Sequence, residues 1–251
     1  MNYLICFDDT DNIHTRGTGH LVAEFADMIH ADGWGGCSRI TRHQLYVNDA
    51  VPYTSHNSAM CMNVNTRPEI VQNILDRAIR YILQEAAQGS DPGLCLVSLD
   101  TTEDYSRLVD FGKRSKTSVL TKTEAYELAS DLNVHLSEHG GTGDGIIGAL
   151  AGTGLRLSGN DGRFRGWIEM DTKREAVPVD ELLAFSEIDA VLPVETDGRH
   201  DGSPSRQDLV QLPEKLKTVL KNHCSVLPVK PFSGAGPVKW RALEKAEVKL
   251  Y

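Results

Sequence analysis

The sequence predicts an α/β protein, with α+β as the alternative, in which a mixed sheet is layered with helices. Short apolar segments that fit strands alternate with segments of helical spacing over the first 155 residues, which is typical of layered α/β folds. The length of 251 residues allows one to two domains. We expect either one intertwined unit or two domains, 1–155 and a smaller α+β portion at 156–251 with a basic, irregular C-terminal segment.

A strand, a loop and a helix are predicted at the start of the chain. Residues 3–7 are apolar and end at acidic residues, which predicts a short buried strand. Residues 21–29 carry apolar side chains at helical spacing, and the glycines within 33–36 indicate the end of that helix. Residues 43–47 and 59–64 then predict a pair of short strands around a polar turn.

The clearest helix of the sequence is predicted over residues 70–83, which carry a long apolar stripe closed by Gly89 and Pro92. A buried strand is expected at 94–99 because its residues form a short apolar run. The later expected elements are a helix at about 123–132, a glycine-rich loop entering a helix over 140–154, a strand over 163–170 and a helix near 208–221.

Composition and charge exclude several classes of protein. The chain has 40% hydrophobic residues and a net charge of −9, which is ordinary for a globular protein and excludes a disordered one. No apolar run approaches the roughly 20 residues of a membrane helix. Acidic residues follow after seven positions, too soon for a signal peptide, so we expect a cytoplasmic protein without a membrane partner. Five cysteines without a CxxC pair argue against a zinc ribbon.

The charge is unevenly distributed along the chain. Residues 214–251 hold eight Lys and Arg and three Glu side chains, a net charge of +5, so the remaining 213 residues carry −14. A net-acidic body disfavours nonspecific binding of nucleic acid, although a basic segment at its end still suits a phosphate. RNA is therefore left open as a partner but is not favoured, and the sequence does not fix the oligomeric state.

The most informative segment is an acidic cluster directly after the first predicted strand. Three carboxylates within four residues repel one another unless a cation lies among them, and hard oxygen ligands suit a Mg²⁺ ion that carries nucleotide phosphates. The helix that follows offers free N–H groups to a phosphate. The alternative is an acidic turn with a threonine N-cap. The residues concerned are Asp8, Asp9, Thr10 and Asp11, followed by Gly17, Thr18 and Gly19.

A second glycine-rich segment contains Gly143-Asp144-Gly145-Ile146-Ile147-Gly148. It matches the dinucleotide pattern GxGxxG only formally, because no convincing strand precedes it, and no Gly-Lys-Ser/Thr follows as in a Walker A loop. Its glycines, with Gly141 before them, allow the backbone to approach a ligand closely. The alternative reading is tight packing of the helix that follows.

Two further polar segments are candidates for binding phosphate or substrate. Lys113, Arg114 and Lys116 form the densest basic run and fit a clamp for triphosphate oxygens, with a solvated basic turn as the alternative. His56 and Asn57 lie in the polar turn between two predicted strands, which is a suitable place for contacts to a substrate.

Residues 135–139 spell HxxEH, an order that one class of zinc peptidases uses on an uninterrupted helix. Gly140 and Gly141 follow at once and would end such a helix. We therefore expect His135 and His139 in a solvated last helical turn, where partly charged histidines complement the helix dipole.

Three motifs together resemble the kinase-like N-terminal part of the agmatinylcytidine synthetase (TiaS) family, archaeal enzymes that modify the wobble cytidine of an isoleucine tRNA. The family shows DDTD after an apolar strand, then Gly-Met-Cys-Thr-Thr, where this chain has Asp8–Asp11 and Gly17-Thr18-Gly19. Its Asn-Pro-Asn-hydrophobic-Pro and Lys-Thr-Arg-Gly-Asn-Gly-Ala stretches are similar to residues 48–52 and 53–59. Its Gly-Arg-Gly-Leu-Ile-Gly-Ala-Leu-Ala-Ala stretch resembles residues 143–152.

The resemblance covers about residues 1–195 and implies ATP-dependent phosphoryl transfer with ATP and Mg²⁺ as cofactors. It implies that the three aspartates bind Mg²⁺ and nucleotide, and it aligns Thr18 with a threonine that the family phosphorylates. The oligonucleotide-binding barrel and the four-cysteine zinc ribbon of the family have no counterpart here, so we expect a small-molecule acceptor. The expected site is Asp8, Asp9, Asp11 and Thr18 for catalysis, Thr10, Gly17, Gly19, Lys113, Arg114, Lys116, Gly141, Gly143, Asp144 and Gly145 for ATP, and His56 and Asn57 for the acceptor.

Two alternative functions remain at this stage. The position of Thr18 lacks the adjacent threonine of the family, and the arginine of the Thr-Arg-Gly-Asn run is replaced by Ser55 or His56. These changes fit a nucleotide-binding module that has lost turnover. The basic segment fits an RNA-modifying enzyme that acts with a separate RNA-binding partner.

Overall fold

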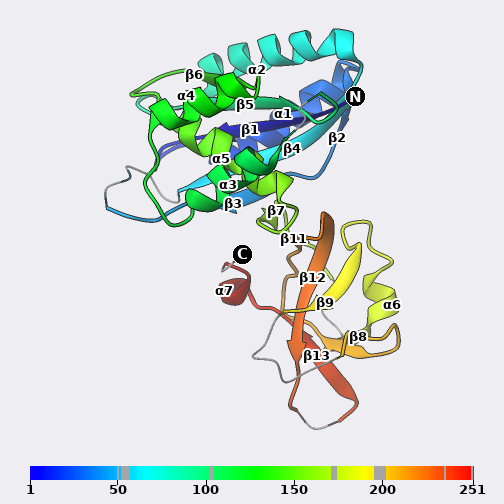
Figure 1. The fold of residues 1–251 in the computed structure, drawn as a ribbon. Coiled ribbons are helices and arrows are strands. Elements are labelled where there is room, and N and C mark those ends of the chain that lie inside the picture. Colours follow the sequence, from blue (N-terminus) through cyan, green and yellow to red (C-terminus); the bar gives the residue numbers. More distant parts are fainter. Residues whose placement is uncertain are drawn as a thin grey trace. The chain divides into compact units, whose positions relative to one another are not determined.

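The structure is a computed structural model that describes residues 1–49, 51, 57–101, 104–170, 174–194, 202–234, 236–249 and 251. The chain forms two compact units, Met1–Ser158 and Gly159–Tyr251, and each is described by itself (Figure 1). Helices and strands combine in the first unit, and the strands of the chain pair both antiparallel and in parallel, so the predicted α/β class with a mixed sheet is confirmed. No helix in the described part of the chain is long and apolar enough to cross a membrane.

The N-terminal unit is built on an antiparallel sheet with β1 at its centre. The strand order is β6-β5-β1-β4-β3, and β2 pairs with β4. Cys6 on β1 lies directly opposite Cys61 on β4 and Cys95 on β5, so three thiols form a row across the sheet. The strands are β1 (Asn2–Asp8), β2 (Gly35–Cys37), β3 (Thr41–Gln44), β4 (Ser58–Thr66), β5 (Gly93–Ser98) and β6 (His135–Glu138).

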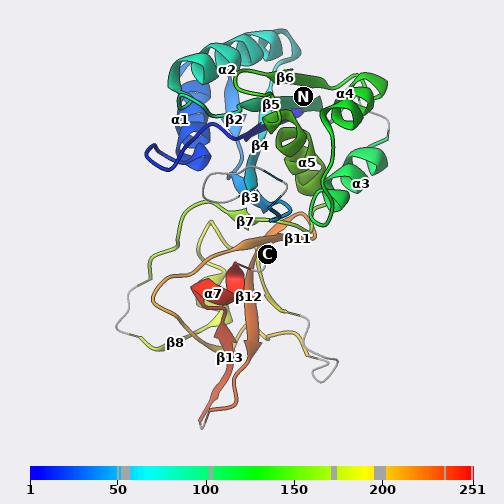
Figure 2. The same ribbon diagram turned by 90° about the vertical axis from the view of Figure 1, so that its left-hand side faces the viewer.

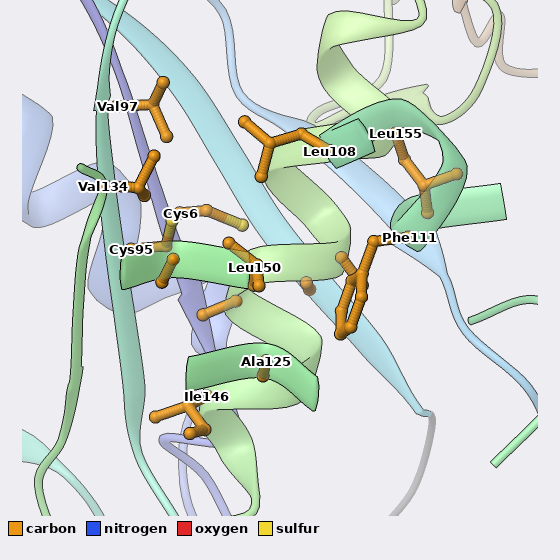
Figure 3. Close-up of a cluster of buried hydrophobic side chains, with 14 of the residues drawn as sticks. Cys6, Cys95, Val97, Leu108, Phe111, Ala125, Val134, Ile146, Leu150 and Leu155 are labelled. Carbon is orange, nitrogen blue, oxygen red and sulfur yellow. The ribbon is translucent and has the colours of Figure 1, made fainter. Parts of the chain in front are cut away.

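Helices cover both faces of this sheet, as Figure 2 shows. Ile5 and Phe7 point to α1 and α2, where they pack in one core. Leu4 and Cys6 point to α3, α4 and α5 and pack in a second core, whose side chains Figure 3 draws. Burial on both faces explains why residues 3–7 are continuously apolar. The helices are α1 (Thr18–Ala31), α2 (Val71–Glu85, after the 3₁₀ turn Pro68–Ile70), α3 (Ser106–Arg114), α4 (Lys122–Asp131) and α5 (Gly145–Leu157).

Helix α5 uses glycine to approach its neighbours closely. A Cβ at Gly152 would lie 2.6 Å from Cys6 Sγ, and one at Gly154 would lie 1.9 Å from the carbonyl oxygen of Leu108 on α3. Backbone and sulfur atoms at such distances leave no room for a methyl group. Gly152 and Gly154 are therefore packing residues of α5.

The strands of the C-terminal unit have the order β7-β11-β12-β13-β10-β8 and pair mostly antiparallel, while β9 with β12 and β10 with β13 pair in parallel. Val210, Leu227 and Val229 lie in its core with Leu182 of α6. Its elements are β7 (Arg163–Phe164), β8 (Ala176–Pro178), α6 (Val179–Leu182), β9 (Ala190–Pro193), β10 (Leu209–Gln211), β11 (Val219–Lys221), β12 (Cys224–Pro231), β13 (Val238–Ala242) and α7 (Lys245–Val248).

Two expectations for this unit are wrong. The helix predicted near 208–221 is replaced by β10 and β11, because Pro213 removes a backbone donor from the middle of the segment and the flanking residues pair with β13 and β12. The strand predicted over 163–170 is limited to β7, because Gly166 turns the backbone at φ 92° and only Ile168 bridges back to Leu216. In the N-terminal unit, α3 was not predicted.

Candidate functional site

A cavity of about 600 Å³ lies in the N-terminal unit. Its walls come from the end of β1, the start of α1, the segments flanking the polar turn between β3 and β4, the turn before β5, residues 115–122 and the start of α5. The cavity therefore opens where the carboxyl end of β1 meets the amino ends of helices, the edge of a sheet at which α/β proteins bind ligands.

The predicted acidic cluster forms one wall of this cavity. Asp8, Asp9 and Asp11 line it together with Thr18. The hydroxyl of Thr18 donates a hydrogen bond of 2.7 Å to Asp11 Oδ1 and accepts one of 3.1 Å from the hydroxyl of Thr10. Thr10 is buried and orients the Thr18 hydroxyl through this hydrogen bond. Asp9 adopts the left-handed region at φ 47° and turns the chain at the end of β1. Residues that are close together in the sequence thus line one cavity, because the strand ends in a sharp turn.

The cluster carries more negative charge than its surroundings compensate. Burial raises the pKa of Asp8 well above its usual value, and the charges of Asp9 and Asp11 raise it further. Burial raises the pKa of Asp9 to about 6, with added repulsion from Asp91 and Asp11. A cation that enters the cavity would therefore stabilise the ionised form of these carboxylates.

Two further carboxylates line the cavity. The sequence analysis missed Asp91 and assigned Asp144 to the binding of ATP. Asp91 accepts hydrogen bonds from the Thr142 hydroxyl at 2.7 Å and from the Gly143 backbone N–H at 2.9 Å. Its charge acts on Asp9, and it reaches the cluster because β5 runs antiparallel to β1, with Gly93 paired to Asp8. Asp144, predicted to bind ATP, is the N-cap of α5 and lines the cavity too. The acidic turn before the predicted strand at 94–99 was the available signal for Asp91.

Three helices direct their amino ends at the same space. Thr18 begins α1, Thr121 and Lys122 cap and begin α4, and Gly145 begins α5, and all of them line the cavity. Among the described residues no side chain caps α1 or α5, whereas Thr121 and Glu124 form a capping box on α4. Uncapped helix amino ends present free N–H groups and a partial positive charge, which favour a bound phosphate.

The cavity lining also contains apolar side chains. These are Leu45, Tyr46, Val51, Leu120 and Ile147, together with Val119, which is 51% exposed. Asn57 lines the cavity as well, and its side-chain amide donates a 2.7 Å hydrogen bond to the backbone oxygen of Tyr46. A flat apolar group and a polyanion with its cations would thus each find suitable side chains in one cavity.

The remaining predicted site residues lie at or beyond the edge of the cavity. Gly17 is the N-cap of α1 and Gly19 lies in its first turn. Gly141 and Gly143 adopt positive φ values of 55° and 80° in the loop that holds Asp91. His56 lies outside the described residues.

The basic run at 113–116 does not contribute its cations to the cavity lining. Lys113 and Arg114 end α3, and Arg114 forms an ion pair of 2.5 Å with Glu124. The residues of this stretch that do line the cavity are Ser115 and Ser118, and Lys116 lies beside them outside the lining. A phosphate-binding role for Lys113, Arg114 and Lys116 stays a prediction.

The expectation of a helical turn at 135–139 is wrong. Residues 135–138 form the edge strand β6, on which His135 and Ser137 share one face because side chains alternate along a strand, and His139 follows directly. The Ser137 hydroxyl lies 2.9 Å from His135 Nε2 and 2.8 Å from His139 Nε2. Burial lowers the pKa of both histidines. The helical arrangement of a zinc peptidase is therefore absent from this segment.

Within the described ranges, no group of three or more His, Cys, Asp or Glu side chains is arranged to hold a metal ion. Mg²⁺ is commonly bound through one or two carboxylates plus the phosphates of a substrate rather than by a complete cage of protein ligands. One or two of Asp8, Asp9 and Asp11 suit the first of these arrangements, because they share a cavity with helix ends that suit phosphate.

Comparisons with known proteins place the fold. Neither a protein-family model nor a curated protein matches this chain. The solved structures that are similar include apo TiaS, a tRNA agmatidine synthetase, with 22% sequence identity, a TM-score of 0.53 and coverage of 61% of this chain and 35% of that chain. A complex of TiaS with tRNA and ATP matches with 23% identity, a TM-score of 0.54 and coverage of 61% of this chain and 36% of that chain.

A tRNA fluorescent labeling enzyme matches with 21% identity, a TM-score of 0.54 and coverage of 72% of this chain and 42% of that chain. The matched region thus spans well under half of each of these longer proteins. TM-scores above 0.5 at identities under 25% establish a common fold and no more. The chain has a TiaS-like fold.

Proposed function

We propose that this protein is a Mg²⁺-dependent, ATP-binding phosphotransferase. The observation that carries the proposal is the cavity that three aspartates close together in the sequence line together with the amino ends of three helices. Polyphosphate with its metal ion complements both features, because the helix ends suit the phosphate oxygens and the carboxylates suit the metal. A structural neighbour with the same fold was solved as a complex with tRNA and ATP, which supports ATP as the nucleotide.

The residues of the cavity have distinct roles in this proposal. One or two of Asp8, Asp9 and Asp11 would hold Mg²⁺, which when bound neutralises charge on the phosphates during transfer. The free N–H groups at the start of α1 and α5 bind phosphate oxygens, and the apolar side chains of the cavity lining take the base. Thr18 is positioned by Asp11, so its hydroxyl lies between the carboxylates and a helix end.

In the transfer, an acceptor oxygen forms a bond to the γ-phosphorus while the bond from that phosphorus to the ADP oxygen breaks. The acceptor proton leaves to a carboxylate or to water. The identity of the acceptor is not part of the proposal, and Thr18 or a small molecule fills the same geometric role. A module that binds nucleotide without turnover would share the cavity but release no phosphate.

Thermal melting of the full chain with ATP, with and without Mg²⁺, tests the proposal. A ligand present at 100 times its Kd stabilises by about 2.7 kcal/mol, which raises the Tm of a chain of this size by about 5–10 °C. We expect this rise only with ATP and Mg²⁺ together. Asp8→Asn removes it, while Asp110→Asn on the exposed face of α3 retains it. An unchanged rise in Asp8→Asn contradicts the assignment.

A second candidate function is RNA modification, because the names of the similar structures include tRNA. The basic segment 214–251 offers less free charge than its sequence indicates. Lys230 and Arg241 pair with Glu247, and Lys239 pairs with Asp208. Retention of bulk tRNA that weakens steeply with salt would favour RNA as the acceptor. Retention that does not exceed that of an acidic control protein would favour a small molecule.

A further inference from the structure

Lys122 is the only Lys or Arg among the described residues that line the cavity. Five carboxylates line the same cavity, those of Asp8, Asp9, Asp11, Asp91 and Asp144. The position of Lys122 follows from the local fold, since it is the first residue of α4, directly after the N-cap Thr121. The sequence analysis missed Lys122 because it is a single lysine that lies outside the basic run at 113–116.

The Lys122 ammonium is held by two partners at the rim of the cavity. It forms an ion pair with Glu138 at the end of β6 and donates a 2.7 Å hydrogen bond to the backbone oxygen of Thr142. Both side chains remain partly open to solvent, at 30% for Lys122 and 43% for Glu138. An exposed ion pair of this kind contributes little to folding and separates readily when a better partner arrives.

Gly143 lies next to this ion pair, and the pair is open to solvent. A Cβ at Gly143 would lie 1.4 Å from Glu138 Oε2 and 2.5 Å from Lys122 Nζ, the mobile ends of the two side chains. Glu138 is 43% exposed, so water solvates its carboxylate when Lys122 moves away. Separation of the pair therefore costs little.

We infer that the Lys122–Glu138 ion pair is a latch that opens when nucleotide binds, and that Lys122 then binds the phosphate oxygens of a polyphosphate. The inference rests on the proposed function and adds a regulatory step to it. Four rotatable bonds let the lysine head turn from Glu138 toward the cavity that it already lines. A phosphate surrounded by helix ends is a stronger partner than an exposed carboxylate. Glu138 therefore competes with nucleotide for the same ammonium group.

The latch predicts opposite effects of two substitutions on nucleotide affinity. Lys122→Met removes the phosphate ligand and should weaken binding of ATP with Mg²⁺ by about tenfold or more. Glu138→Gln removes the competing charge while keeping its size, and should tighten binding about two- to fivefold. Lys122→Arg should restore part of the lost affinity. Each Kd is measured by calorimetry on the full chain, after the Tm without ligand has shown that the variant is folded.

Matched controls and a second probe separate this role from a structural one. Arg107 and Asp131 form an exposed ion pair of 2.8 Å outside the cavity lining, so Arg107→Met and Asp131→Asn should leave the Kd unchanged. Tripolyphosphate with Mg²⁺ should show the same loss in Lys122→Met as ATP does, whereas AMP should show little.

The outcomes for the two proposals differ. Binding of ATP by the wild-type chain with an unchanged Kd in Lys122→Met overturns the latch and leaves the proposed function intact. Equal losses for ATP and AMP, or weaker binding in Glu138→Gln, also overturn it. Failure of the wild-type chain to bind ATP with Mg²⁺ overturns the proposed function, and the latch with it.

Discussion

Replacement of Asp9 by asparagine should stabilise the protein in the absence of nucleotide. The carboxyl group of Asp9 has a pKa of about 6, against an ordinary value near 3.9 in an unfolded chain. A carboxylate whose pKa is raised by folding opposes the folded state above the folded-state pKa. Its cost fades as the pH falls through 6 and is absent below about 4. Asparagine keeps the size of the side chain and carries no charge, so it removes the cost.

The magnitude follows from the size of the shift. A rise of about two pKa units corresponds to about 3 kcal/mol at neutral pH. Asp9 is only partly buried, so screening by solvent reduces this to about 1–2 kcal/mol. The backbone does not oppose the change, because Asp9 adopts φ 47° and asparagine tolerates this region better than most residues. For a chain of this size the Tm should rise by about 2–8 °C at pH 8.

Thermal melting at a series of pH values between 4 and 8, in a chelator and without nucleotide, measures the effect. The variant should exceed the wild type at pH 8 and match it near pH 4. Asp208→Asn serves as a control of opposite sign, because a hydrogen bond from Lys239 holds the pKa of Asp208 well below its usual range. It should be less stable than the wild type at pH 8. A lower Tm for Asp9→Asn at pH 8, or a gain independent of pH, would refute the reasoning.

Three further predictions concern the fold. Gly154→Ala should destabilise the chain by about 1–3 kcal/mol in urea unfolding, because its Cβ would lie 1.9 Å from the Leu108 carbonyl oxygen, while Gly36→Ala meets no neighbour and should not do so. A fragment of residues 1–158 should fold and keep its Tm response to ATP with Mg²⁺, because every described residue that lines the cavity lies within it, and loss of the response would contradict this. Glu247→Gln should lower stability by about 1 kcal/mol at pH 7, because Glu247 accepts two 2.7 Å bonds from Arg241. The difference should shrink as the pH falls below about 4, since these bonds hold the pKa of Glu247 well below its usual range, and a loss of undiminished size at pH 3 would contradict it.

The parts of the site that could be predicted are those formed by residues close together in the sequence. Asp8, Asp9 and Asp11 follow a strand that is buried on both faces, and an apolar run ending at acidic residues indicates both the strand and its exit. The glycine segment before α5 was found in the same way. Roles that depend on the ligand remain predictions, because the structure positions these residues without showing what they bind.

The parts that could not be predicted depend on strand pairing. Asp91 joins the cluster only because β5 runs antiparallel to β1, and Lys122 reaches the cavity only because α4 begins there. His135 and His139 were assigned to a helix because a spacing of four fits a helical turn, yet the same spacing also places two side chains on one face of a strand. The pairing of β6 with β5 decides between the two.

The row of Cys6, Cys61 and Cys95 across the central strands has a practical consequence. All three thiols are fully shielded, whereas Cys224 in the other unit is exposed. A thiol reagent should modify Cys224 at once and reach the row only when the sheet opens. The rate of the slow reaction therefore reports the opening free energy of the strand that carries Asp8, without any added label. Nucleotide bound in the cavity should slow the reaction of the three buried thiols and leave the reaction of Cys224 unchanged.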